Sequence, residues 1–252
     1  MPHLAHNRLT VPWHLIFESL AYFVAFRLYL SERRKSGDFL DTHARWSVVL
    51  AAIAGAAIGS KLLFWVENPV HTLNHLTSVE YLMGGKTIVG AILGGTLAVE
   101  WMKRRLGVTR RTGDLFAVPL AVGIAIGRIG CTLAGVHDDT HGIATGLPWG
   151  IDFGDGIRRH PVQLYEVVAM ALLAVALRRI GPPRFAEGDR FRVFVLTYCG
   201  WRVLVDFLKP GVRFFGLTSL QWCSLVALLW YTKDLVRMLR QNSEWKDAVA
   251  HV

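Results

Sequence analysis

The chain has 252 residues, of which 52% are hydrophobic and 19% are charged. Charged residues make up about a quarter of an average soluble protein, so this composition argues against an ordinary soluble domain. The formal net charge of +9 would suit nucleic-acid binding, but the placement of the basic residues, described below, argues against that class of partner.

Apolar runs of membrane-spanning length, roughly 17 to 25 residues, recur along the whole chain. Most of them lack the polar face that a partly exposed helix of a soluble protein shows. In chain order the runs occupy about residues 14–30, 47–65, 86–102, 114–130, 162–178, 192–208 and 217–235. We therefore expect an all-α integral membrane protein with seven transmembrane helices in a single domain, residues 1–252. The first run is followed directly by a basic cluster and is expected to be a retained anchor.

The basic residues gather in alternate loops between these runs. Cytoplasmic loops of membrane proteins carry an excess of Lys and Arg, so we assign these loops to the cytoplasm. The N-terminus is then outside the membrane and the C-terminus inside, as an odd number of spans requires. The loops contain Arg33, Arg34, Lys35 and Arg45; Lys103, Arg104, Arg105, Arg110 and Arg111; Arg178, Arg179, Arg184, Arg190 and Arg192; and Lys233, Arg237, Arg240 and Lys246.

The longest loop on the expected outer side covers about residues 131–161 and is rich in glycine. Loops of this length in a compact bundle tend to be functional. Arg128 precedes the loop and is expected at the outer interface. The stretch HDDTHG, residues 137–142, has histidines and aspartates, but its spacing matches no specific metal site. The three cysteines fit neither a disulfide framework nor a zinc site, so we predict no metal and no cofactor.

The sixth run, YCGWRVLVDFLKP, contains an unusual set of polar side chains. Tyr198, Arg202, Asp206 and Lys209 are spaced four, four and three residues apart, which places them on one helix face. Arg202 and Asp206 are expected to pair at i,i+4. Ionisable groups inside a span usually face a cavity or a partner and mark function. A salt bridge that only joins two helices is the alternative, and both interpretations stay open.

Several cations fall near the expected outer face, where the positive-inside rule disfavours them. Guanidinium groups bind phosphate in a bidentate manner, and the natural anion of an outer leaflet is a phospholipid head group. Lys209 and Arg213 can also simply extend their charged ends to the surface. The cations concerned are Arg128, Arg158, Arg159, Arg202, Lys209 and Arg213.

Two further features concern the first three runs. Small residues in GAAIGS and GGKTIVGAILGG predict close helix packing. His14 and Glu18 lie one turn apart near the outer end of the first run. Such a pair can serve acid–base chemistry, or it can form an interfacial hydrogen bond without catalysis.

Over nearly its whole length the chain resembles the prolipoprotein diacylglyceryl transferase family. The resemblance rests on GSKLLFWVENP, GGKTIVGAILGG, GRIG, PWG, RHPVQLYE and YCGWRVLVDFLKP, in this order. It implies transfer of the diacylglyceryl group of phosphatidylglycerol to the lipobox cysteine thiol of a prolipoprotein, with release of glycerol phosphate. It also implies a bacterial inner-membrane protein whose active site is near the outer leaflet.

By the same resemblance, Arg128 matches the arginine of the family signature and Arg202 the essential arginine of the sixth-run motif. Tyr198, Asp206 and Lys209 fall on that motif's tyrosine, acidic and basic positions. Two arginines could hold the lipid phosphate and stabilise the charge of the departing phosphate.

The chain departs from the family pattern at three positions. Val89 stands where the family has a histidine, Cys131 where GRIG is usually followed by asparagine, and Val136 where a glutamate is expected. His137, Asp138, Asp139 and His141 could replace part of this polar set. A covalent intermediate on Cys131 is a further hypothesis, because the neighbouring Arg128 could lower the pKa of its thiol; a simple packing role is the alternative.

The sequence therefore predicts a seven-helix membrane transferase that binds an anionic phospholipid between its helices. Arg128 and Arg202 are the main candidate residues, supported by Tyr198, Asp206 and Lys209. Further candidates for the head-group site are Arg159, His160, Gln163 and Glu166, and the candidate bases are His14, His137 and His141. A family paralogue with another acceptor and a non-catalytic lipid-binding protein are the alternatives. No two-fold internal repeat supports a transporter, and nothing indicates an oligomer.

Overall fold

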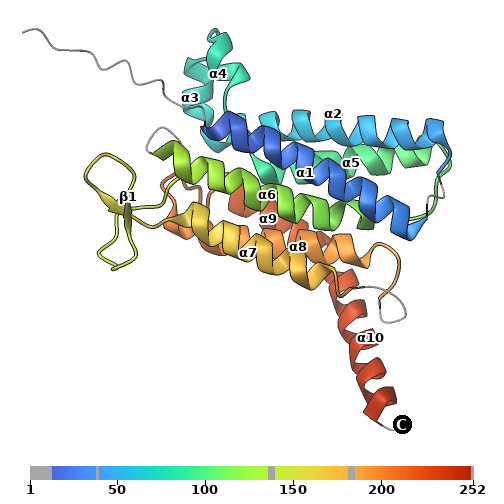
Figure 1. The fold of residues 1–252 in the computed structure, drawn as a ribbon. Helices are drawn as coiled ribbons and strands as arrows, with labels where there is room; N and C mark the ends of the chain where they lie inside the picture. Colours follow the sequence, from blue (N-terminus) through green and yellow to red (C-terminus); the bar gives the residue numbers. More distant parts are fainter. Residues whose placement is uncertain (1–12, 38–39, 136–139, 181–184, 251–252) are drawn as a thin grey trace, which may run out of the picture.

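The computed structural model describes residues 13–37, 40–135, 140–180 and 185–250, and these are mostly helical (Figure 1). The first half contains α1 (Trp13–Ser36), α2 (Thr42–Glu67), α3 (Pro69–Asn74), α4 (Val79–Met83), α5 (Ile88–Arg105) and α6 (Asp114–Ala134). The second half contains β1 (Ile151–Asp152), β2 (Arg158–Arg159), α7 (Val162–Leu177), α8 (Asp189–Val205), η2 (Asp206–Leu208), α9 (Ser219–Trp230) and α10 (Thr232–Ala250).

The long helices lie side by side and form a bundle (Figure 1). The main helix pairs are α2 with α5, α1 with α6, α6 with α7 and α8 with α9. The short helices α3 and α4 and the β1–β2 hairpin project at one end, whereas α10 leaves the bundle at the opposite end (Figure 1). The hairpin pairs Ile151 with Arg159 and Asp152 with Arg158 in antiparallel register.

Glycines explain the close contact between α2 and α5. A Cβ atom added at Gly59 would lie 2.3 Å from the carbonyl oxygen of Gly90, and one at Gly94 would lie 2.3 Å from that of Gly55. Backbones approach this closely only where side chains are absent, as in the small-residue interfaces of membrane helices. The packing expected from the small residues of these two runs is confirmed.

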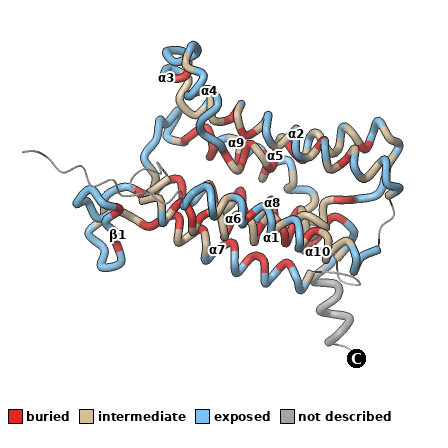
Figure 2. Tube along the Cα trace, turned by 45° about the horizontal axis from the view of Figure 1, so that its top comes forward, coloured by how far each residue is buried: buried red, intermediate tan, exposed pale blue. Residues whose placement is uncertain are grey.

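The outward faces of the helices are apolar. Figure 2 shows exposed residues recurring along α2 and α7, and many are large hydrophobic side chains, including Leu50, Ile53, Ile58, Leu172 and Val175. By length and composition α2 and α6 can each cross a membrane, and α7 and α9 are shorter apolar helices. A mostly helical protein with apolar helices therefore agrees with the expected class.

The last expected run, residues 217–235, is divided in the structure. The apolar helix α9 ends at Trp230, and α10 begins at Thr232 with Lys233 and Asp234 in its first turn. The Thr232 hydroxyl donates a hydrogen bond to the carbonyl oxygen of Leu229 at the junction. The apolar segment is thus shorter than the sequence suggests, and the polar helix α10 follows it.

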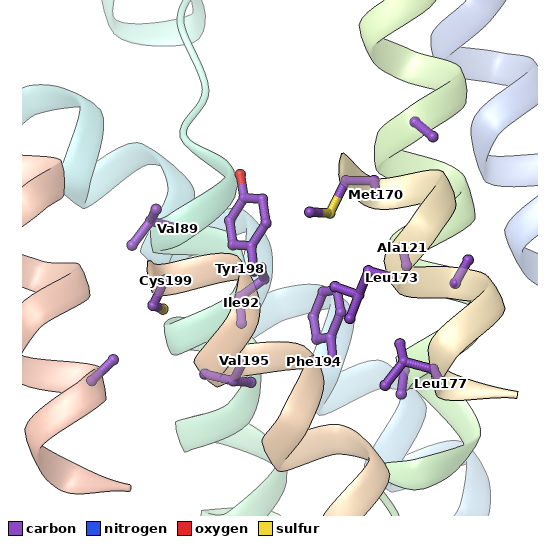
Figure 3. Close-up of a cluster of buried hydrophobic side chains, with 14 of the residues drawn as sticks. Val89, Ile92, Ala121, Met170, Leu173, Leu177, Phe194, Val195, Tyr198 and Cys199 are labelled. Atoms are coloured by element: carbon purple, nitrogen blue, oxygen red, sulfur yellow. The ribbon is translucent and has the colours of Figure 1, made fainter. Parts of the chain in front are cut away.

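The hydrophobic core lies between α5, α6, α7, α8 and α9. Figure 3 shows the Tyr198 ring rising from α8, with Val89 of α5 on one side and Met170 of α7 on the other. Phe194 and Tyr198 are stacked at 6.1 Å between ring centroids. The core therefore reaches Tyr198, whose hydroxyl belongs to the polar site described next.

Candidate functional site

A cluster of buried polar side chains lies where α6, α7 and α8 meet. The Glu166 carboxylate of α7 is its centre: Oε2 lies 2.9 Å from Arg128 Nε and 3.5 Å from Arg202 Nη1. Oε1 of the same carboxylate accepts a hydrogen bond of 3.1 Å from the Tyr198 hydroxyl. Arg202 Nη2 lies 2.6 Å from Asp206 Oδ1. All five residues are buried. The Glu166 carboxylate thus joins, inside the bundle, two guanidinium groups that come from different helices.

The pairing explains how so many charges lie inside the bundle. A buried ion needs an opposite charge and hydrogen bonds to offset its lost hydration. Arg128 and Arg202 share the Glu166 carboxylate, and Asp206 adds a second negative charge on the Arg202 side. The cluster is therefore close to electrically balanced, and both arginines are held in place.

Gln163 lies one turn before Glu166 on α7. Its side chain is 1% exposed. Its amide oxygen and nitrogen both lack a hydrogen-bond partner among the described residues. Since buried amides are nearly always paired, this amide, one turn from Glu166, is a candidate contact for a polar ligand group.

Lys209 follows η2 and adds a cation at the edge of the cluster. Burial, together with the nearby guanidinium groups of Arg202 and Arg128, lowers the pKa of the Lys209 ammonium to about 7. Its charge therefore changes near neutral pH, whereas both arginines stay charged.

A second group of polar side chains lies on the other side of Arg128, between α6 and α1. Arg128 Nη1 is 3.8 Å from Cys131 Sγ, which is 3.8 Å from His14 Nδ1. His14 Nε2 is 3.8 Å from Glu18 Oε2. Gly130 allows this approach, because a Cβ atom there would lie 2.6 Å from the Cβ of Phe17 on α1.

The β1–β2 hairpin uses its own arginines for local contacts. Arg158 donates hydrogen bonds to the carbonyl oxygens of Gly150 and Pro148. Arg159 Nη1 lies 2.6 Å from Asp155 Oδ1. That hydrogen bond with Arg159 lowers the pKa of the Asp155 carboxyl. Arg159, expected near the head group, is thus placed in the hairpin and not in the buried cluster.

The remaining candidate histidines lie apart from the arginine–glutamate cluster or outside the described residues. His160 Nδ1 lies 3.4 Å from the Tyr165 hydroxyl. The His141 ring stacks on Phe153, and His141 Nδ1 lies 3.3 Å from the carbonyl oxygen of Gly142. His137, with Asp138 and Asp139, lies outside the described part of the chain.

Two relationships were not predicted from the sequence. The bridging position of Glu166 depends on how α6, α7 and α8 are rotated; the motif RHPVQLYE indicates Glu166 as a candidate but not its partners. The contact of Cys131 with His14 joins residues 117 positions apart, which no local spacing indicates. Glu67, at the end of α2, also lies within electrostatic range of Arg202, Asp206 and Lys209.

Comparison with known proteins gives the same family for most of the chain. A family model described as prolipoprotein diacylglyceryl transferase matches residues 2–233. Three similar proteins are each named phosphatidylglycerol–prolipoprotein diacylglyceryl transferase. The Clostridium tetani protein is 28% identical over 211 residues (80% of this chain, 83% of the relative). The Bordetella bronchiseptica protein is 30% identical over 242 residues (88% of each chain). The Methylobacillus flagellatus protein is 34% identical over 187 residues (70% and 69%).

The range matched by the family model includes Arg128, Glu166 and Arg202, and the resemblance seen in the sequence motifs is confirmed. The chain belongs to the prolipoprotein diacylglyceryl transferase family.

Proposed function

We propose that this protein transfers the diacylglyceryl group of phosphatidylglycerol to the lipobox cysteine of a prolipoprotein and releases glycerol phosphate. The observation that carries the proposal is the buried pair Arg128 and Arg202, held by the one carboxylate of Glu166. Relatives that carry this activity in their names support the choice of donor and acceptor.

The two guanidinium groups suit a phosphate diester that becomes a phosphate monoester. Arginine binds phosphate oxygens in a bidentate manner. When the ester bond breaks, negative charge builds on the departing phosphate, and fixed cations in a site of low dielectric stabilise it strongly. Tyr198 and Asp206 orient this pair, Tyr198 through Glu166 and Asp206 through Arg202.

The neighbouring polar groups fit the rest of the head group. The Gln163 amide, which has no hydrogen-bond partner among the described residues, is suited to the free hydroxyls of the glycerol head. Lys209 adds a positive charge at the edge of the cluster, where the pKa of about 7 leaves it partly charged at neutral pH.

The reaction is a displacement at carbon. The acceptor thiol loses its proton, and the thiolate attacks the glyceryl carbon that bears the phosphate ester. A carbon–sulfur bond forms, the carbon–oxygen bond breaks, and its electron pair leaves with glycerol phosphate. Arg128 and Arg202 act on the leaving group in this scheme and not on the thiol.

The proposed setting is a bacterial inner membrane crossed seven times, with the N-terminus outside and the C-terminus in the cytoplasm. The cluster lies near the C-terminal ends of α6 and α8 and near the start of α7, on the side where the β1–β2 hairpin projects (Figure 1). The basic loops and α10 lie toward the opposite end. This arrangement supports a phosphate site near the outer leaflet, from which lipid would diffuse in laterally between helices.

A transfer assay with the purified protein tests the proposal. Labelled phosphatidylglycerol is the donor and a lipobox-cysteine peptide the acceptor, and Arg128→Ala and Arg202→Ala are compared with Arg213→Ala. Arg213 is a matched control because it lies outside the cluster, with its guanidinium over the Phe207 ring. We expect lipidated peptide from the wild type and from Arg213→Ala, and a loss of about 100-fold or more in the other two, as for removal of a charge-stabilising donor.

Other outcomes would contradict the proposal. Peptide that stays unmodified while the lipid binds, with binding weakened by Arg128→Ala and Arg202→Ala, would indicate a different acceptor or a binding protein. Equal activity in all three variants would show that the buried pair is not the phosphate site.

A further inference from the structure

We propose that His14 is the base that removes the proton from the acceptor thiol, with Glu18 orienting its ring. This inference rests on the proposed function and names a residue for its first step. The structure brings α1 and α6 into contact at Gly130 and Phe17, and this contact places the imidazole next to Cys131 and one side chain away from Arg128.

The two nitrogens of the His14 ring have different neighbours. Nε2 is 3.8 Å from the Glu18 carboxylate, and Nδ1 is 3.8 Å from the Cys131 sulfur. A carboxylate beside Nε2 favours the tautomer with its proton there, which leaves Nδ1 as the basic nitrogen. Nδ1 is therefore directed toward α6 and Arg128, the side on which the lipid phosphate is proposed to bind.

Glu18 is itself fixed by two partners. Lys86 Nζ, in the segment before α5, lies 2.5 Å from Glu18 Oε1, and the Tyr22 hydroxyl donates to the same oxygen at 3.0 Å. Within the described part of the chain, the charged and titratable groups near His14 include Glu18 and Tyr22 on α1, Cys131 and Arg128 on α6, and Lys86. A carboxylate next to an imidazole can orient a catalytic base; here the two groups are at ion-pair distance, 3.8 Å, and their contact has to shorten to a hydrogen bond in the reacting complex.

Exposure distinguishes His14 from the other polar groups near Arg128. Its side chain is 54% exposed, whereas that of Glu18 is 23% exposed and Cys131 is buried at 6%. An acceptor peptide can reach an imidazole that is half exposed. The sulfur–nitrogen contact between Cys131 and His14 is the contact that an incoming thiol would have to make. Val89, at the position of the family's histidine, is apolar and buried beside Tyr198 (Figure 3), so it cannot accept a proton.

The proton balance is simple. Nδ1 takes the thiol proton, the thiolate displaces glycerol phosphate from the glyceryl carbon, and the imidazolium returns its proton to the released phosphate or to water. Cys131 does not carry the diacylglyceryl group in this scheme. A thioether on Cys131 would have a poor leaving group at a saturated carbon, and the enzyme would stop after one turnover.

The experiment compares His14→Gln with His43→Gln, a matched control at the start of α2 where the side chain is exposed. Transfer is measured from about pH 6 to about pH 9.5, and phosphatidylglycerol binding is measured separately. We expect His14→Gln to lower kcat by about 100- to 10,000-fold near neutral pH, as for loss of a general base, with lipid binding unchanged. The difference in kcat between wild type and His14→Gln should shrink as the pH rises above the pKa of a free cysteine thiol, about 8.5, because the acceptor thiol then loses its proton without a base. Added imidazole restores part of the activity of His14→Gly.

Three results would overturn the inference. One is a His14→Gln enzyme with wild-type rate and pH profile. Another is a rate loss that is the same at every pH and is not rescued by imidazole, which indicates a structural role. The third is a diacylglyceryl adduct on Cys131 that is transferred onward to the peptide. A wild-type protein without any transfer activity would instead refute the proposed function itself, so the two failures are distinguishable.

Discussion

Glu166 accepts a hydrogen bond from Tyr198 and forms ion pairs with Arg128 and Arg202. The pairing of Arg202 with Asp206 follows from their i,i+4 spacing and is confirmed at 2.6 Å. The Arg128–Glu166 contact could not be predicted in this way, because the two residues belong to different helices and meet only through the rotation of α6 against α7. Sequence spacing thus predicts pairs within one helix, and the structure adds the pairs between helices.

Replacing Glu166 with Gln tests whether its carboxylate balances the charges of Arg128 and Arg202. The amide keeps the shape of the side chain but leaves two buried guanidinium groups short of a counter-charge, and breaking a buried pair costs about 3 to 5 kcal/mol. We expect Glu166→Gln to have a lower unfolding temperature in detergent than the wild type. Added phosphatidylglycerol should raise the unfolding temperature more in the variant than in the wild type. Glu187→Gln, which removes a half-exposed partner of Arg110, is the control. A variant as stable as the wild type would show that Glu166 does not balance the two arginines.

The ammonium of Lys209 predicts a pH dependence of lipid binding. Its pKa of about 7 means that the positive charge is present below neutral pH and is lost as the pH rises. We expect the KM for phosphatidylglycerol to rise several-fold between about pH 6 and about pH 8.5. Lys209→Arg keeps its charge throughout this range, so its KM should stay flat. An equal rise in both proteins would assign the effect to another group.

At the scale of elements, close packing of the second and third runs could be predicted from the spacing of their small residues, and the structure adds which glycines of α2 and α5 meet. The division of residues 217–235 into α9 and α10 could not, because the apolar run fades gradually into the polar helix. The β1–β2 hairpin was also not predicted: its strands have two residues each, too few for an alternating pattern to show.

Gly59→Ala is expected to weaken the α2–α5 pair. The new methyl group would meet the Gly90 carbonyl oxygen at 2.3 Å and the Gly94 Cα at 2.8 Å, and both are backbone atoms that cannot move aside alone. Overpacking of this kind costs about 1 to 3 kcal/mol, to be measured as loss of unfolding free energy in detergent. Gly200→Ala in α8 is the control, because nothing lies within 4 Å of the added atom and alanine favours a helix. Equal stability of the two variants would contradict the close packing.

At the scale of the whole molecule, family and helical class follow from the motifs and the apolar runs. The number of spans and their direction remain a proposal that rests on the basic loops. Arg128 and Arg202 belong to the C-terminal parts of α6 and α8. The β1–β2 hairpin and α10 lie toward opposite ends of the bundle (Figure 1), a separation that the proposed orientation requires.

Cysteine labelling in intact cells tests this orientation. Phe215, which is 98% exposed between η2 and α9, is replaced with Cys to report the outer side, and Lys35→Cys in the last turn of α1 reports the cytoplasmic side. A membrane-impermeant maleimide should label Phe215→Cys directly and Lys35→Cys only after permeabilisation, each relative to the wild-type chain with its own three cysteines. The reverse pattern would invert the topology, and labelling of both in intact cells would refute an odd number of spans between them.

The carboxylate shared by the two arginines has a consequence for how the enzyme cycles. In the proposed reaction the lipid phosphate competes with Glu166 for the same guanidinium groups, so we expect the site to bind the donor weakly. On this proposal the membrane that surrounds the enzyme contains the donor lipid at high concentration. Weak binding of the donor is then no disadvantage, because tight binding of the ground state does not raise kcat once the site is saturated. When the doubly charged product leaves in this scheme, Glu166 pairs again with both arginines and neutralises their charge. On this proposal we expect turnover to be limited by release of the product from the site.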